Sequence, residues 1–154
     1  MDTVDLLRPD AVIHDLRAKS KKHALQELAK HAARLSAQDP RDLCAALLAR
    51  ERLGTTGVGH GVAIPHAKIV NFDKLYGVFA RLETPIDFDA VDGEPVDLIF
   101  LLLAPEGAGA EHLKALARVS RFLRDRENCA KLRGADSRDA LLALLTDHAK
   151  SHAA

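Results

Sequence analysis

Residues 50–68 read RERLGTTGVGHGVAIPHAK, and this stretch joins the end of a helical pattern to an apolar run and a histidine. Its four glycines are Gly54, Gly57, Gly59 and Gly61. Because so many glycines cost conformational entropy, they are typical of a backbone that must approach something closely. We therefore expect the rest of the chain to act as a scaffold for this loop and for His66, which follows Pro65.

Two helices are predicted before the loop. Apolar residues recur at helical spacing over 21–36, and Ser20 precedes them as a cap. Asp39 and Pro40 form a second start signal, and the apolar pattern after them predicts a helix to Leu53. Gly54 then ends that helix.

The segments after the loop predict a sheet followed by helices. Strands are expected over 62–64, 75–82 and 96–103, with a turn-rich connection over 83–95 and a short edge strand over 11–13. Helices are expected over 111–124, over 126–132 and from Ser137 onward. Because the last strand is apolar on both faces, the fold class predicted is α/β, a mixed β-sheet flanked by helices on both faces as a three-layer sandwich.

Composition excludes several classes of function. The 154 residues are 47% apolar, which suits a single domain over 1–154. Lys plus Arg and Asp plus Glu both number 22, so no basic surplus favours nucleic acid. No apolar run is long enough for membrane insertion, and the acidic N-terminus is unlike a signal peptide. We expect a cytoplasmic protein whose Cys44 and Cys129 are structural thiols.

The chemistry expected of His66 is phosphoryl transfer. A neutral imidazole is a nucleophile near neutral pH and can carry a phosphoryl group, provided that N–H donors or cations surround the phosphate oxygens. The loop residues Gly54, Thr55, Thr56, Gly57, Gly59 and Gly61 are candidates for such a phosphate-binding loop. The glycine pattern alone leaves a second interpretation open, a tight turn that ends in a surface histidine.

Arg50 and His112 are candidate partners of His66. The arginine precedes Gly54 at the end of a predicted helix, and a guanidinium suits phosphate oxygens. The second histidine lies near the start of the helix expected from 111, where the helix dipole favours a neutral ring and a nearby anion. Each is also compatible with an ordinary solvated residue.

Metal and triad chemistry fit the sequence less well. The spacing of His60, His66 and His112 matches no standard zinc motif, so no metal is predicted. No serine follows the nucleophile-elbow pattern of hydrolases.

Residues 50–68 closely resemble the signature of the fructose, mannitol and nitrogen class of enzyme IIA proteins of the phosphoenolpyruvate phosphotransferase system. The resemblance extends to SKKHALQELA, LETPIDFDAVDGEPVDLIFLLLAP and EHLKALARVSRFLRD, and thus to nearly the whole chain. It implies that His66 accepts a phosphoryl group on Nε2 from a histidine phosphocarrier protein. The family pattern also has an arginine at Arg50 and a second active-site histidine at His112, and it implies no cofactor.

The resemblance is greatest to the nitrogen-regulatory branch, whose members control target proteins through their phosphorylation state. Thr55 replaces a common serine, Ala67 a frequent glycine and His60 a frequent asparagine, so an extra ionisable ring is expected near the phosphate. Two alternatives remain. One is a sugar-transport enzyme IIA that passes phosphate to a fructose- or mannitol-type enzyme IIB, and the other is a binding module whose histidine is never phosphorylated.

A carrier that docks beside His66 requires an exposed apolar surface around the loop. Val58, Val62 and Phe88 are the candidates from the sequence.

Overall fold

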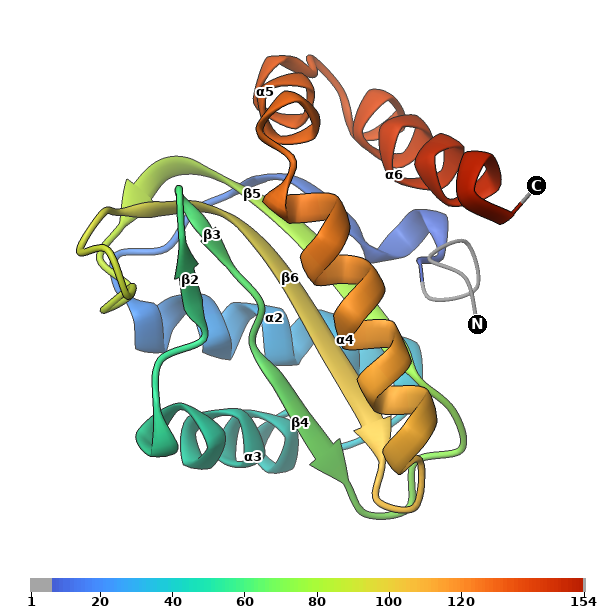
Figure 1. Ribbon diagram of the computed structural model, residues 1–154. Coiled ribbons are helices and arrows are strands. Elements are labelled where there is room, and N and C mark those ends of the chain that lie inside the picture. Colours follow the sequence, from blue (N-terminus) through green and yellow to red (C-terminus); the bar gives the residue numbers. More distant parts are fainter. Residues whose placement is uncertain (1–6, 154) are drawn as a thin grey trace.

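The computed structural model describes the backbone of residues 7–153 and the side chains of residues 7–146, and within this part six strands form one mixed sheet (Figure 1). The strands are β1 (Val12–Leu16), β2 (Gly57–Gly59), β3 (Val62–Ala63), β4 (His66–Ile69), β5 (Tyr76–Ile86) and β6 (Val96–Pro105). Their order is β1-β5-β6-β3-β2, and β4 also pairs with β6. The β5–β6 and β2–β3 pairs are antiparallel, whereas the β1–β5, β3–β6 and β4–β6 pairs are parallel.

Helices cover both faces of the sheet. They are α2 (Lys21–Ser36), α3 (Pro40–Leu53), α4 (Gly109–Arg124), α5 (Arg126–Gly134) and α6 (Arg138–Ala153), and a 3-10 helix, η1 (Pro9–Ala11), precedes β1. One apolar core joins the sheet to α2 and α3, and a second joins it to α4, α5 and α6. The predicted three-layer α/β sandwich is confirmed.

The side chains of the central strand β6 point alternately into the two cores. Its side chains on the α4 face are Leu98, Phe100 and Leu102. Those on the α3 face are Ile99, Leu101 and Leu103. All six are buried, as expected of a strand covered on both sides.

The helices α2 and α3 begin where their capping residues predicted. The hydroxyl of Ser20 accepts a hydrogen bond of 3.1 Å from the His23 N–H at the start of α2. The carboxylate of Asp39 accepts one of 2.8 Å from the Arg41 N–H, and Pro40 occupies the first position of α3. These caps satisfy backbone donors that the first helical turn leaves unpaired.

The loop side of the sheet differs from the prediction, which placed no strand over Gly57–Gly59. β5 extends to Ile86, so the expected connection over 83–95 begins within a strand. β3 and β4 both run parallel to β6, and between them the Pro65 carbonyl accepts a 2.9 Å bond from the Leu102 N–H. They act as one strand interrupted at Pro65, which has no N–H to donate. His66 therefore begins a strand and does not end a loop.

Within residues 7–153, no helix is long and apolar enough to cross a membrane. The single domain over 1–154 and the cytoplasmic location stay predictions.

Candidate active site

His66 has one ring nitrogen fixed by the backbone. Its Nδ1 lies 3.0 Å from the carbonyl oxygen of Ile64, two residues earlier. A carbonyl oxygen only accepts, so Nδ1 carries the proton in this contact. The neutral ring then has its lone pair on Nε2, the nitrogen available for nucleophilic attack.

Arg50 approaches that second nitrogen. Its Nε lies 3.3 Å from Nε2 of His66, and its Nη1 donates a 2.9 Å bond to the Gly54 carbonyl. A guanidinium has no acceptor, so Arg50 donates to Nε2. This contact requires the same His66 tautomer as the contact with Ile64, the one with the proton on Nδ1. The last turn of α3 and its terminal glycine thus aim Arg50 at the ring.

The surroundings keep His66 neutral. The pKa of His66 is lowered, first by burial of the half-buried ring and then by the charge of Arg50. The hydrogen bond to Ile64 and the charge of Glu51 oppose this shift of the pKa but do not reverse it. A lowered pKa favours an unprotonated Nε2 at neutral pH.

His112 faces His66 from the first turn of α4. The two ring centroids lie 5.7 Å apart at an interplanar angle of 70°. The side chain of His112 is 5% exposed, and its Nε2 is buried with no hydrogen-bond partner in the described part of the chain. Burial, His66 and Lys68 all lower the pKa of His112. A neutral, unpartnered ring nitrogen beside His66 is suited to contact a group attached there.

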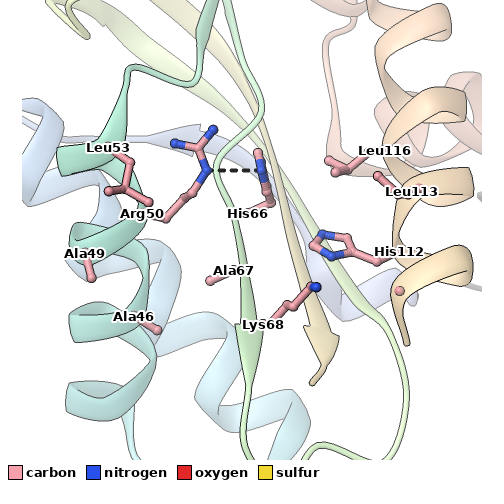
Figure 2. A pocket seen from close by; sticks show the side chains of 11 residues that line it. Ala46, Ala49, Arg50, Leu53, His66, Ala67, Lys68, His112, Leu113 and Leu116 are labelled. Atoms are coloured by element: carbon pink, nitrogen blue, oxygen red, sulfur yellow. Dashed lines mark hydrogen bonds between the residues drawn. The ribbon is translucent and has the colours of Figure 1, made fainter. Parts of the chain in front are cut away.

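A cavity of about 630 Å³ lies between α3 and α4, and these residues line it (Figure 2). The lining residues are Ala46, Ala49, Arg50 and Leu53 from α3, His66, Ala67 and Lys68 from β4, and Gly109, His112, Leu113 and Leu116 from α4. The structure therefore brings the three predicted catalytic residues to one cavity, although they come from three separate elements.

Lys68 lines the same cavity and was not predicted. It lies two residues after His66 in β4, so both side chains point to the α4 face of the sheet, and Figure 2 shows its ammonium beside His112. Recognising HAKI as a strand would have revealed this cation, because residues i and i+2 share a face.

The glycine-rich loop packs against other parts of this chain. The Gly57 N–H donates to the Thr55 hydroxyl at 3.1 Å, and a Cβ on Gly57 would lie 2.9 Å from Ala90. At Gly61 the φ angle is +80°, and a Cβ there would collide with Arg133. The close approach predicted from the glycines is thus an approach of the backbone to other parts of this chain.

The neighbouring amide of Thr56 is also engaged. It donates a 3.0 Å bond to the carboxylate of Glu51, which contacts the Thr56 hydroxyl as well. Lys21 holds the same carboxylate at 2.6 Å, and the Glu51 side chain is 6% exposed. None of the described residues over 54–61 lines the His66 cavity, and the loop touches the site through the bond from Arg50 to Gly54.

His60 lies elsewhere, contrary to the expectation of an extra ring near the phosphate. It occupies the turn between β2 and β3, where its N–H donates to Asp92 at 2.9 Å and its ring contacts Arg126 of α5. Within the described chain, no group of three or more His, Cys, Asp or Glu side chains is placed to hold a metal ion.

The exposed apolar residues near the site differ from those predicted. Val62 and Phe88 are buried in the core, so these two predictions are wrong, whereas Val58 is exposed as predicted. Leu53 and Leu113 are 84% and 69% exposed and flank the cavity from α3 and α4. We name Leu53 and Leu113 the leucine rim.

Comparisons with known proteins show which family and which fold the chain resembles. Residues 5–148 match the family model described as phosphoenolpyruvate-dependent sugar phosphotransferase system, EIIA 2. The chain is 55% identical over 145 residues to a nitrogen regulatory protein of Bradyrhizobium diazoefficiens, which covers 94% of this chain and 95% of that protein. The crystal structure of nitrogen regulatory protein IIA-Ntr from Neisseria meningitidis superposes with a TM-score of 0.87 at 36% identity, covering 92% and 97% of the two chains. IIA mannitol from Escherichia coli shares the fold, with a TM-score of 0.76 at 21% identity over 90% of this chain and 98% of that one.

Proposed function

The chain belongs to the EIIA type 2 family of the phosphoenolpyruvate-dependent sugar phosphotransferase system and is a homologue of nitrogen regulatory proteins, and from this premise we propose that His66 is its phosphoryl acceptor. The donor is a histidine phosphocarrier protein, and the phosphorylation state of His66 controls regulated target proteins. Arg50 and His112 assist the transfer.

The observation that carries the proposal is the pair of hydrogen bonds to the His66 ring. The Ile64 carbonyl holds the proton on Nδ1 and the Arg50 guanidinium points at Nε2. Both contacts fix the tautomer whose Nε2 is nucleophilic, and its lowered pKa keeps that nitrogen unprotonated.

The transfer balances without a cofactor. The Nε2 lone pair attacks the phosphorus of the donor's phosphohistidine, an N–P bond forms, and the electron pair of the breaking N–P bond returns to the donor's imidazole. Positive charge develops on the His66 ring, and the Nδ1–H that donates to the Ile64 carbonyl stabilises it. The phosphoryl oxygens then meet the guanidinium of Arg50 and the unpartnered Nε2 of His112, which donates when that nitrogen carries its proton.

The leucine rim supports a protein donor. Two leucines that flank a cavity of about 630 Å³ offer an apolar contact, while the reacting nitrogen lies within the cavity. A docked carrier would remove water from the cavity and strengthen the contact between Arg50 and the transferred group.

The direct test is phosphorylation in the reconstituted relay. The protein is incubated with phosphoenolpyruvate, the first enzyme of the relay and its phosphocarrier, and its intact mass is recorded. We expect one acid-labile phosphoryl adduct on the wild type and on His60→Ala, and none on His66→Ala. An adduct on His66→Ala, or none on the wild type, would refute the assignment.

Two further measurements separate this function from its alternatives. Rapid transfer from phosphorylated protein to a fructose- or mannitol-type enzyme IIB would indicate a transport component. For a regulator, partners captured by pull-down differ between the phosphorylated and free protein, and His66→Ala reproduces the free form. Identical capture in both states would indicate a binding module that does not use the phosphoryl group.

A further inference from the structure

A second cavity, of about 240 Å³, lies between the β2–β3 turn and the α4–α5 junction. Its lining residues are His60, Leu123, Arg124, Arg126, Cys129 and Arg133. We name it the arginine cavity. It shares no lining residue with the His66 cavity, so a ligand here is additional to the phosphoryl transfer proposed above.

One wall of the arginine cavity is held rigidly. Arg133 forms a forked ion pair with Asp97, with nitrogen–oxygen distances of 2.9 and 3.1 Å from Nε, and its Nη2 donates to the His60 carbonyl at 2.9 Å. The N–H of His60 is fixed in turn by Asp92. His60 has a φ of 55°, and the glycine after it leaves the space that Arg133 occupies. The turn and Arg133 therefore form a prebuilt edge of the cavity.

The other wall carries two arginines, Arg124 and Arg126, that form no ion pair among the described residues. Arg126 contacts His60 Nε2 through Nη2 at 3.3 Å, and because a guanidinium only donates, this contact uses the lone pair of His60. Arg124 makes no ion pair within the part of the chain that the structure describes. No carboxylate is among the lining residues. Two guanidinium groups without a carboxylate partner in the described chain, those of Arg124 and Arg126, thus line one small space together with the Asp97-paired Arg133.

Carboxylates around the arginine cavity, including that of Asp92, already make other contacts. Asp125, between Arg124 and Arg126 in the sequence, accepts the Glu127 and Asn128 amides at 2.9 and 3.2 Å and caps α5. Asp97 is taken by Arg133. These carboxylates offset part of the positive charge. An anion in the cavity would pair with the guanidinium groups of Arg124 and Arg126, neither of which forms an ion pair within the described residues.

We propose that the arginine cavity binds a small oxyanion of the phosphate class that carries two or more negative charges. Guanidinium forks match the geometry of phosphate oxygens, and several forks around one space favour a multiply charged ligand. Because ligand pockets for drug-sized molecules measure about 300–1,000 Å³, a cavity of about 240 Å³ suits a compact group such as a diphosphate. Buried Leu123 and Cys129 form its apolar floor and offer no competing charge.

The test is a titration of isotope-labelled protein with inorganic pyrophosphate at low ionic strength, followed residue by residue through amide chemical shifts. The same titration with succinate distinguishes phosphate oxygens from carboxylates. We expect saturable shifts at His60, Gly61 and Cys129 with pyrophosphate, and an affinity about tenfold weaker in the double variant Arg124→Gln, Arg126→Gln. The matched control is Arg121→Gln, on α4 but outside the cavity, with the wild-type affinity.

Three results would overturn the proposal. They are shifts confined to the His66 cavity, an affinity in the double variant within about twofold of the wild type, and succinate binding as tightly as pyrophosphate. The double variant is also phosphorylated at the wild-type rate, since neither arginine lines the His66 cavity. Failure of the anion site is therefore distinguishable from failure of the phosphoryl-transfer proposal.

Discussion

His60 and His66 lie six residues apart, and each has an arginine nitrogen 3.3 Å from its Nε2. Their settings differ in other respects. His66 is half-buried and its Nδ1 is bonded to the Ile64 carbonyl, whereas His60 is exposed on a turn whose contacts with Asp92 and Arg133 are made by its backbone. The arginine contact to Nε2 is thus common to both rings, but the second contact at Nδ1 and the burial belong to His66.

This difference suits His66, and not His60, to the nucleophilic role proposed above. A ring held at both nitrogens presents one lone pair in one direction, and desolvation lowers its pKa. A surface ring that is held at one nitrogen, such as that of His60, makes only a polar contact with its neighbour. Substitutions at the two sites should therefore have unequal effects on phosphoryl transfer.

The largest difference is expected between the two arginines. Arg50→Gln removes a charged donor aimed at the reacting nitrogen, so the phosphorylation rate should fall about 10²- to 10³-fold. Arg126→Gln removes the equivalent contact to His60 and should leave the rate within about twofold of the wild type. Rates are measured by quenched-flow with labelled carrier, and thermal unfolding verifies that both variants fold. Equal losses in the two variants would mean that the arginine at His66 has no special role.

The next effect is the pH dependence of His66. Only the neutral ring attacks, so the rate should be constant above the pKa of His66 and fall about tenfold per pH unit below it. Because the folded pKa lies below the unfolded value of about 6.5, the folded state binds fewer protons than the unfolded state between those two values. The unfolding free energy should accordingly decrease as pH falls from the unfolded pKa through the folded pKa.

NMR titration of the His66 ring measures this pKa directly. Arg50→Gln should raise it, because the charge of Arg50 contributes to lowering it. A midpoint above the unfolded value in the wild type would contradict the assigned effect of burial.

Much of the scaffold was predictable because its signals are local. Ser20 and Asp39 stand immediately before the helices that they cap, and the apolar run of β6 identifies a central strand without knowledge of its neighbours. His66, Arg50 and His112 were found from the loop, the helix ends and the family resemblance together, and the cavity contains all three.

The missed features depend on contacts between distant residues. β4 is four residues long and pairs with Leu102 and its neighbours, far along the chain, so HAKI carried too little pattern to indicate a strand. Lys68 was missed for the same reason. Glycine is needed at position 57 because Ala90 lies close to its backbone. Nothing in the loop sequence distinguishes such an approach from a close approach to a phosphate.

A moderate effect is expected at the leucine rim. Leu113→Ser removes an exposed apolar side chain beside the cavity, so the KM for the carrier should rise about five- to tenfold while kcat stays unchanged. Val91→Ser is the matched control, since Val91 is 73% exposed but does not line the cavity. Steady-state phosphorylation with varied carrier concentration gives both constants. An equal rise for Val91→Ser, or a loss confined to kcat, would exclude the rim as a docking contact.

A smaller effect is expected at Lys68. Its side chain is exposed, so solvent weakens the attraction between its ammonium and a phosphoryl group, and Lys68→Ala should lower the rate about threefold. Lys131→Ala is the control, because Lys131 is paired with Glu127 on α5 and does not line the His66 cavity. Quenched-flow rates compare the two. No difference between these variants would mean that Lys68 lines the cavity without acting on the transferred group.

The smallest effect is expected from His60→Asn, which replaces the ionisable ring by a residue that tolerates the same positive φ. Because His60 contacts Arg126 and does not line the His66 cavity, neither the phosphorylation rate nor the midpoint of its pH profile should change. The measurement is the pH–rate profile of the variant beside that of the wild type. A shifted midpoint would show that the His60 turn and His66 are electrostatically coupled along β3. The two histidines could then no longer be treated as independent sites.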